Sequence, residues 1–184
     1  MPRFQQVTAD VPLDALYKGW HIPGRLTAGY YEADLITEIM GSGYSSRLYQ
    51  ALVKEQQLFS AIHCYHTGSI DPGLLMVEGH VRSGVSLEAA NEAVDKEIKK
   101  LVAEGVTDNE LMKSKNKIES MIAFEDMTLL NRANNIAFYE LLGDAEWINK
   151  EWDKYNAVNT TGVLQVAGEI FRPGNCSTLF YSKK

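Results

Sequence analysis

The sequence has little of what marks several specialised classes of protein. Only two of its 184 residues are cysteines, Cys64 and Cys176, and no CxxC pair occurs, so neither a disulfide framework nor a cysteine-based zinc site is predicted. Both cysteines lie in apolar, strand-like runs, which favours buried thiols. No apolar run is long enough to cross a bilayer, and the first residues lack the charged-then-apolar order of a signal peptide. We therefore expect a soluble chain with no membrane partner, in a compartment that the sequence does not specify.

Positive charge is also scarce. Lys and Arg total 18 against 24 Asp and Glu, which gives a formal net charge of -6. Nucleic acid and anionic membrane surfaces are therefore not expected as partners. The nearest approach to a basic block is Lys113, Lys115 and Lys117, which we interpret as a solvated helix face.

The histidines do not form a recognisable metal motif. None of the four belongs to His-x-x-Glu-His or His-Glu-x-x-His. In a strand, His63 and Cys64 point to opposite faces, while Cys64 and His66 share one. That pair could add His80 only if the hairpin register allowed it, and a simple pairing places His80 nearer Ala61. We predict no catalytic residue and no metal ligand in this chain. The four histidines are His21, His63, His66 and His80.

Gly41-Ser42-Gly43 has the spacing of neither a nucleophile elbow nor a phosphate-binding loop. Its glycines suit a hinge between two helical segments, because a residue without Cβ can take positive φ. Ser45 or Ser46 is a suitable N-cap for the second segment. The tripeptide is therefore predicted to be a helix-to-helix turn.

The pattern of apolar residues predicts an α+β fold with a mostly antiparallel sheet and helices packed on one face. The pair 58–65 and 74–81 should form an antiparallel hairpin. Predicted helix N-caps are Thr27, Ser86, Thr107 with Glu110 in a capping box, and Thr160 or Thr161. We expect one domain over residues 1–184. Strands are predicted at 4–9 (with 13–21 as an extension), 58–65, 74–81 and 177–181, and helices at 27–40, 86–105, 107–124, 128–142, 146–155 and 160–171.

Two long stretches resemble one protein family. Residues 41–65, GSGYSSRLYQALVKEQQLFSAIHCY, are similar to the C-terminal, non-zinc module of the M16 zinc metallopeptidases, the pitrilysin and mitochondrial-processing-peptidase group. Residues 158–181, VNTTGVLQVAGEIFRPGNCSTLFY, resemble the end of that module, where Arg-Pro-x-Asn leads into a closing strand. The resemblance covers nearly the whole chain, which it identifies as the C-terminal module of a longer peptidase.

The resemblance implies a division of labour. Such modules help to enclose unfolded peptides, while an N-terminal zinc-bearing module, in the same chain or a partner subunit, cuts them. Zinc is then expected on that other module and not here, and this chain alone should be inactive. The alternative is a proteolytically inactive structural or assembly subunit of the same family. An unrelated α+β ligand-binding domain would require both matches to be accidental.

The resemblance also identifies positions to examine. Active members place an Arg and a Tyr against the substrate backbone, and an ungapped match puts these at Val53 and Ser60, which cannot replace them. A shift of one residue offers Lys54, and a small deletion offers Phe59. Arg47 is equally expected to be a structural salt-bridge partner. The residues predicted to face a peptide are Arg47, Lys54, Phe59 and His63.

Overall fold

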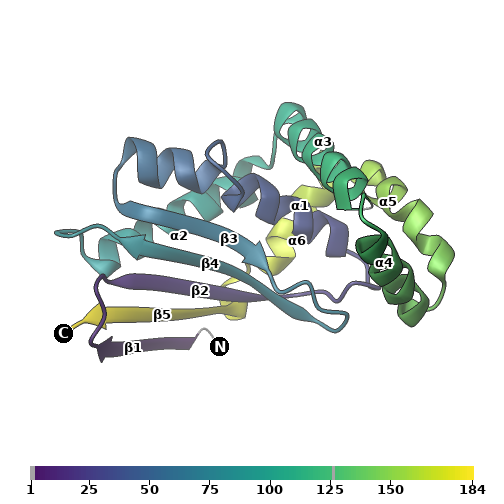
Figure 1. Ribbon diagram of the computed structural model, residues 1–184. Helices are drawn as coiled ribbons and strands as arrows, with labels where there is room; N and C mark the ends of the chain where they lie inside the picture. The colour runs from purple at the N-terminus through teal and green to yellow at the C-terminus, as the bar shows by residue number, and fades with distance from the viewer. Residues whose placement is uncertain (1–2, 126) are drawn as a thin grey trace.

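The computed structural model describes residues 3–125 and 127–184 of the chain. Its centre is a five-stranded sheet in the order β1-β5-β2-β4-β3, in which β1 and β5 run parallel and the other neighbours antiparallel. The helices cover one face of this sheet and leave the other open (Figure 1). The predicted α+β class, with a mostly antiparallel sheet, is confirmed. The strands are β1 (Arg3–Ala9), β2 (Ala15–Ile22), β3 (Phe59–His66), β4 (Gly73–Val81) and β5 (Cys176–Lys183).

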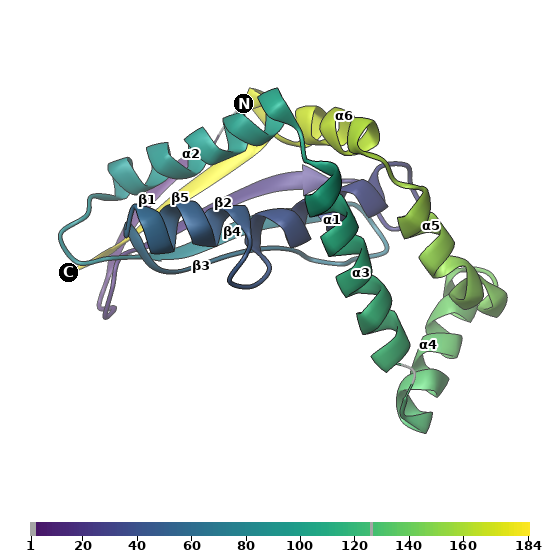
Figure 2. The ribbon, with the colours of Figure 1, turned by 90° about the horizontal axis from the view of Figure 1, so that it is seen from above.

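The helices divide into a layer over the sheet and an arm beyond it. Seen from above, α1, α2 and α6 lie along the sheet, whereas α3 and α5 lead away from it to α4, which protrudes at one end (Figure 2). The α-helices are α1 (Tyr30–Gly41), α2 (Leu87–Glu104), α3 (Asp108–Glu125), α4 (Leu129–Leu142), α5 (Glu151–Ala157) and α6 (Thr160–Ile170). Shorter segments are the π-helical η1 (Tyr49–Glu55) and the 3₁₀ turns η2 (Ala145–Lys150) and η3 (Pro173–Asn175).

The strand predictions are confirmed except at the N-terminus. Residues 13–21 do not extend the first strand, because the chain reverses after Ala9 and returns as β2. The closing strand β5 then lies between β1 and β2. The predicted hairpin is present as β3 and β4, with Ala61 opposite His80 as expected.

Two predicted helix starts are confirmed in atomic detail. Ser86 Oγ accepts from the Ala89 amide at 3.2 Å. In the capping box, Thr107 Oγ1 accepts from the Glu110 amide at 3.2 Å, and Glu110 Oε2 accepts from the Thr107 amide at 2.8 Å. Each bond satisfies an amide that the helix itself leaves unpaired.

Two other predicted caps are wrong. Thr27 Oγ1 donates to the Gly24 carbonyl, and α1 begins only after Gly29, whose φ is 88°. The cap of α6 is Asn159, whose Oδ1 accepts from Gly162 N at 2.9 Å, so neither Thr160 nor Thr161 caps it. At the start of α6, Asn159, Thr160 and Thr161 are adjacent short polar residues, and spacing alone could not choose between them. The predicted helix over 146–155 is divided between η2 and α5.

One hydrophobic core lies between the sheet and its helices, and it includes residues from β2 through α6. Trp20 and Leu16 contribute from the sheet, and Leu35 and Val94 from the helices above it. Among the described residues, no helix is both long and apolar enough to cross a membrane.

The lysines near residue 115 do not form the solvated face that we predicted. Lys117 Nζ lies 2.7 Å from a Glu38 carboxylate oxygen, and Lys113 hydrogen-bonds to Ser45. Lys115 donates to the Asn156 and Val158 carbonyls on another side of α3. Because successive lysines point in different directions, they tie α3 to separate parts of the fold.

Candidate functional site

The edge strand β3 borders the first candidate site. Among the described residues, β3 pairs with β4 alone, so one side of its backbone is not used by the sheet. A groove of about 500 Å³ lies between this strand and the end of α1. Its lining includes Thr37, Glu38, Ser42, His63, Tyr65 and Glu78. An unpaired strand edge can accept an extended peptide through backbone hydrogen bonds.

The glycine hinge forms one wall of this groove. A Cβ on Gly41 would lie 2.1 Å from the Cys64 amide nitrogen, so only glycine allows α1 to lie directly on β3. Gly43 has a φ of 77°, as the hinge interpretation required. The predicted serine cap is wrong, because Ser46 Oγ instead donates to the Gly43 carbonyl at 2.8 Å. The hinge is thus fixed by close packing on one side and by local hydrogen bonds on the other.

Arg47 is held inside the fold beside the hinge. Its guanidinium donates to both carboxylate oxygens of Glu110, at 2.7 and 2.8 Å, and to the Gly105 carbonyl at 2.8 Å. The hydrogen bond from Arg47 lowers the pKa of Glu110 to about 2 against the opposing effect of burial. Within the described part of the chain, Arg47 Nη1 is a buried side-chain nitrogen that has no hydrogen-bond partner. Arg47 therefore makes a structural ion pair, which was the alternative to peptide contact in the sequence analysis.

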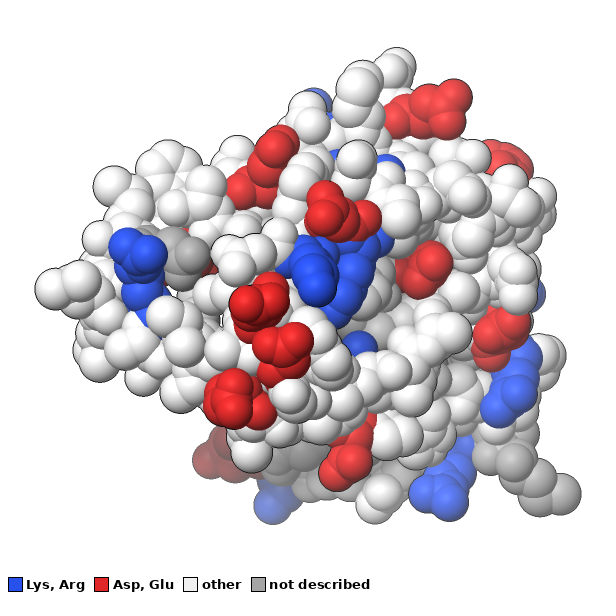
Figure 3. All heavy atoms as spheres, turned by 90° about the vertical axis from the view of Figure 1, so that its right-hand side faces the viewer, with Lys and Arg blue, Asp and Glu red and all other residues white. Residues whose placement is uncertain are grey.

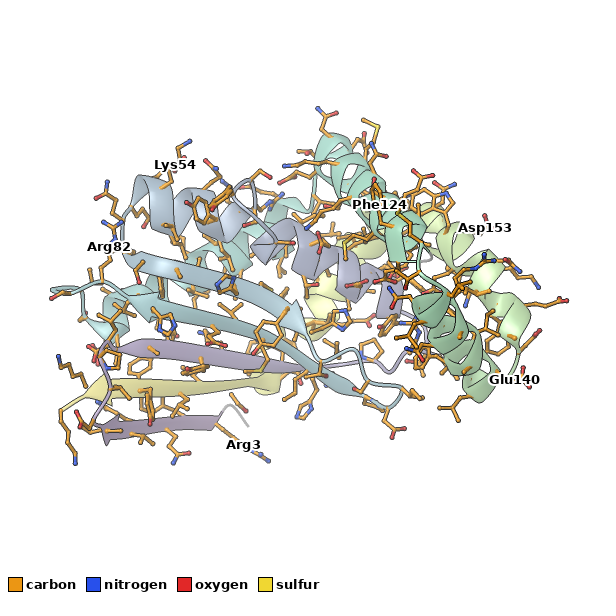
Figure 4. All side chains as sticks on the ribbon, viewed as in Figure 1. Arg3, Lys54, Arg82, Phe124, Glu140 and Asp153 are labelled. Carbon is orange, nitrogen blue, oxygen red and sulfur yellow. The ribbon has the colours of Figure 1, made fainter. Side chains whose placement is uncertain are left out.

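The positions of the family Arg/Tyr pair are not suited to substrate contact. Val53 is buried, and Ser60 Oγ donates to the His80 carbonyl at 3.2 Å. Phe59 is 0% exposed, and this burial contradicts the prediction of a peptide-facing side chain there. Lys54 is exposed and lies on the side of η1 turned away from the sheet (Figure 4). A shifted alignment offers Lys54 and Phe59 in place of the Arg/Tyr pair, and of these two residues only Lys54 is accessible.

His63 occupies the opposite face of β3 from the core. Its neighbour across the hairpin is Glu78, and both side chains are on the open face. Tyr65 OH donates to the Glu78 carboxylate at 3.3 Å. His63 and Tyr65 thus place a polar edge along the sheet beside the groove.

A second hollow of about 490 Å³ lies on the open face of the sheet, and we did not predict it. It is lined by apolar and aromatic side chains from several strands, with His21 and Arg3 at its border. The sequence signal for this hollow is the alternation of side chains along β2. Leu16 and Trp20 are buried in the core, and alternate residues between them face the open side of the sheet. The prediction that residues 13–21 extend the first strand does not include this alternation. The lining includes Phe4, Tyr17, Leu74, Met76 and Leu179.

The metal-binding side chains of the described residues do not fit a catalytic zinc ion. His66 Nε2 lies 2.7 Å from Asp34, and its Nδ1 accepts from the Gly68 amide at 2.9 Å, so both ring nitrogens are engaged. Burial alone would raise the pKa of Asp34, but hydrogen bonds from His66 and Tyr155 lower it below its ordinary value. In residues 3–125 and 127–184, no three His, Cys, Asp or Glu side chains are grouped as metal ligands. Zinc coordination by the described residues is therefore not supported.

A half-buried polar network joins the arm to the body. Arg25 donates to Glu151 at 2.7 Å and to the Tyr139 hydroxyl at 3.1 Å, which links α5 and α4 to the segment before α1. Tyr155 OH donates to Asp34 at 2.5 Å. Charged and phenolic groups thus help to fix the arm to the sheet layer, beside core residues of α3 and α5 such as Ile118 and Trp152.

Comparisons with known proteins agree with this geometry. A sequence model of the peptidase M16 inactive domain matches residues 2–118. The Bacillus subtilis (strain 168) protein YmxG, described as an uncharacterized zinc protease, is 25% identical over 142 residues, which are 77% of this chain and 34% of YmxG. A protease structure from Helicobacter pylori has a TM-score of 0.90 at 20% identity and covers 97% of this chain and 44% of that one. An inactive peptidase domain from Bordetella parapertussis has a TM-score of 0.85 at 18% identity, covering 97% of this chain and 95% of that one.

This chain belongs to the peptidase M16 family, in which it is an inactive domain. It spans about a third of the length of its curated relative YmxG. The similarity to the Helicobacter pylori and Bordetella parapertussis structures shows that this chain shares their fold. The sequence match ends within α3, whereas the structural likeness extends over the arm and the closing strand.

Proposed function

We propose that this chain is the substrate-enclosing, non-catalytic half of an M16 zinc endopeptidase that acts on unfolded peptides. A separate N-terminal module, in the same chain or a partner subunit, would hold the zinc and cut. The observation that carries the proposal is the free edge of β3 beside a groove of about 500 Å³. Membership of the inactive-domain family and similarity to a zinc protease support it.

The edge of β3 would bind the peptide backbone rather than particular side chains. Backbone pairing is tolerant of sequence, as enclosure of diverse unfolded peptides requires. His63 lies on this strand and lines the groove, so it would contact a peptide that lies along the edge. Lys54 points away from the sheet (Figure 4), so it would contact only a part of the peptide that extends beyond the groove. Arg47 would act indirectly, because its contacts with Glu110 hold the hinge in place.

The backbone mechanism can be tested with matched probes. Fluorescence anisotropy would compare a labelled unstructured peptide with the same peptide N-methylated at alternate residues. We expect the N-methylated peptide to lose most of its affinity for this chain assembled with its zinc-bearing module, since it cannot donate to a strand edge. Equal binding of both peptides would exclude strand addition.

The side-chain contribution can be tested at Lys54. Lys54→Ala should weaken peptide binding about threefold, because an exposed charge contributes less than about 1 kcal/mol. Lys100→Ala on α2 is the matched control, since Lys100 is also exposed but lies in the helix layer. Unchanged affinity in Lys54→Ala would exclude Lys54 from the peptide path.

A scaffold role is the second candidate function. It is favoured by Val53 and Ser60, which lack the groups that assist catalysis in active members. The discriminating observation is His-x-x-Glu-His in the module or subunit that pairs with this chain. Its presence, with cleavage by the pair, supports the peptidase, and its absence from every associated chain supports the scaffold.

A further inference from the structure

The hollow on the open face of the sheet forms where two neighbouring strands carry small residues. Gly19 of β2 lies opposite Ser177 of β5 on one side and opposite Met76 of β4 on the other. A Cβ on Gly19 would lie 3.0 Å from Met76 Sδ, so a larger residue there would displace the thioether and begin to fill the hollow. Glycine weakens a strand interior, and it often marks a place where a ligand approaches the sheet closely. Gly19 and Ser177 thus form the floor of the hollow.

The walls around this floor are aromatic, aliphatic and thioether groups. Side chains alternate between the two faces of a strand, so Tyr17 and His21 stand on either side of the floor along β2. Leu179 lies opposite Tyr17, and Leu74 lies opposite His21. The volume of about 490 Å³ is within the range of about 300–1,000 Å³ that is typical of ligand pockets, which are mostly apolar with a few polar groups. The hollow is therefore large enough to hold a bulky side chain of a ligand.

The charges around the hollow disfavour a cationic ligand. Within the described part of the chain no Asp or Glu lines it, although the chain as a whole has a net charge of -6, and Arg3 and His21 lie at its border. The arm end of the molecule differs, because Figure 3 shows basic side chains there with acidic ones around them. A lysine entering the hollow would lose water without gaining a carboxylate, whereas an apolar side chain would gain from leaving water. The lining therefore selects for apolar and aromatic groups.

The hollow adjoins the groove along β3. Tyr65, which lines the groove, lies opposite Met76 of the hollow, and Glu78 of the groove lies opposite Tyr17 of the hollow. Gly19 is on the third strand from the free edge, and neighbouring strands lie about 4.8 Å apart. A peptide paired with β3 would thus lie about 14 Å from the floor of the hollow, a distance that about four extended residues cross.

We propose that the hollow around Gly19 is a subsite for one large apolar side chain, aromatic by preference, of the unfolded peptide. That side chain belongs to a residue about four positions or more beyond the segment paired with β3. The subsite rests on the proposed peptide-holding function and adds selectivity to it. Backbone pairing along β3 tolerates any sequence, whereas the hollow distinguishes peptides by the apolar surface that they bury.

Three labelled peptides test the selectivity. Each is a 16-residue chain of Gly, Ser and Gln that differs only at one position, which carries Phe, Ala or Lys. Fluorescence anisotropy measures their affinity for this chain assembled with its zinc-bearing module, with zinc removed by a chelator so that no peptide is cut. The Phe peptide should bind about tenfold more tightly than the Ala peptide, because its ring leaves water, and the Lys peptide no more tightly than the Ala peptide. Equal affinities for all three would overturn the subsite.

Filling the hollow should remove this preference. Ser177 is exposed, so Ser177→Phe should place a ring in the hollow and reduce the preference for Phe over Ala to less than twofold. Gly19→Leu fills the hollow from its floor and is a second, independent variant, since Gly19 is not among the glycines with positive φ. Val7→Phe is the matched control, because it adds the same ring to the open face of β1 outside the hollow, and it should keep the tenfold preference. A preference that survives in both filling variants would contradict the subsite.

The hollow and the edge of β3 fail in different ways. If N-methylation abolishes binding but Phe, Ala and Lys peptides bind equally, strand addition stands and the subsite is wrong. If N-methylation has no effect while Ser177→Phe removes the preference for Phe, the subsite stands and strand addition is wrong. If none of the peptides binds, both proposals fall. Circular dichroism checks that each variant retains its secondary structure.

Discussion

The hinge end and the arm of this molecule use apolar residues in opposite ways. At the hinge, Leu52 and Phe59 are completely buried, and Gly41 lies against the backbone of β3. In the arm, Leu129 is 86% exposed and Leu130 70% exposed. The hinge is therefore built for stability and close packing, whereas the exposed apolar residues of α4 contribute little to the stability of this chain.

Side-chain truncation should expose the largest contrast between the two regions. Phe59→Ala is expected to lower the free energy of unfolding by about 3–5 kcal/mol, because it removes a fully buried ring and leaves a cavity. Leu129→Ala should change it by less than about 0.5 kcal/mol, since an exposed side chain loses little on truncation. Urea denaturation of dilute protein measures both. Comparable losses would show that α4 is part of the folding core.

Adding a single methyl group at the hinge should give the next largest effect. Gly41→Ala is expected to cost about 3 kcal/mol, because the new Cβ would lie 2.1 Å from the Cys64 nitrogen. Gly168→Ala is the control within α6, where nothing lies within 4 Å of the added Cβ and helix propensity favours alanine. Thermal unfolding distinguishes them, and a Gly41→Ala protein as stable as wild type would contradict the tight hinge.

Breaking the Arg47 ion pair should have a smaller effect that depends on pH. Glu110→Gln is expected to cost about 2 kcal/mol at pH 7, because it weakens the hydrogen bonds that Arg47 makes. The pKa of Glu110 is lowered from 4.5 to about 2, so its contribution is present above pH 4.5 and is lost as pH falls toward about 2. Urea denaturation at a series of pH values should show the two proteins converging in acid. A difference that stays constant from pH 7 to about 2 would mean that the charge of Glu110 is not involved.

The sequence predicted those elements whose signals are local. The Thr107 capping box and the β3–β4 pairing follow from spacing within a few residues, and both are present. The insertion of β5 between β1 and β2 joins the two ends of the chain, so no local pattern contains it. Asn159 caps α6 rather than Thr160, and these adjacent residues are both suitable caps by type, so the sequence pattern does not distinguish them.

The candidate site was only partly predictable for the same reason. The substitution of the family pair by Val53 and Ser60 could be seen directly in the sequence. The burial of Phe59 depends on a register irregularity between Phe59 and Ala61, and strict alternation along the strand does not reveal it. The hollow on the open face combines residues from separate strands, so it appears only once the strand order is known.

The central claim is that this chain holds peptide while another module holds zinc. The most direct measurement is cleavage of unfolded casein by this chain, by its zinc-bearing module and by the two together, with zinc content determined by elemental analysis after gel filtration. The account predicts cleavage by the assembled pair and neither stoichiometric zinc nor cleavage with this chain alone. Stoichiometric zinc and proteolysis in this chain by itself would contradict it.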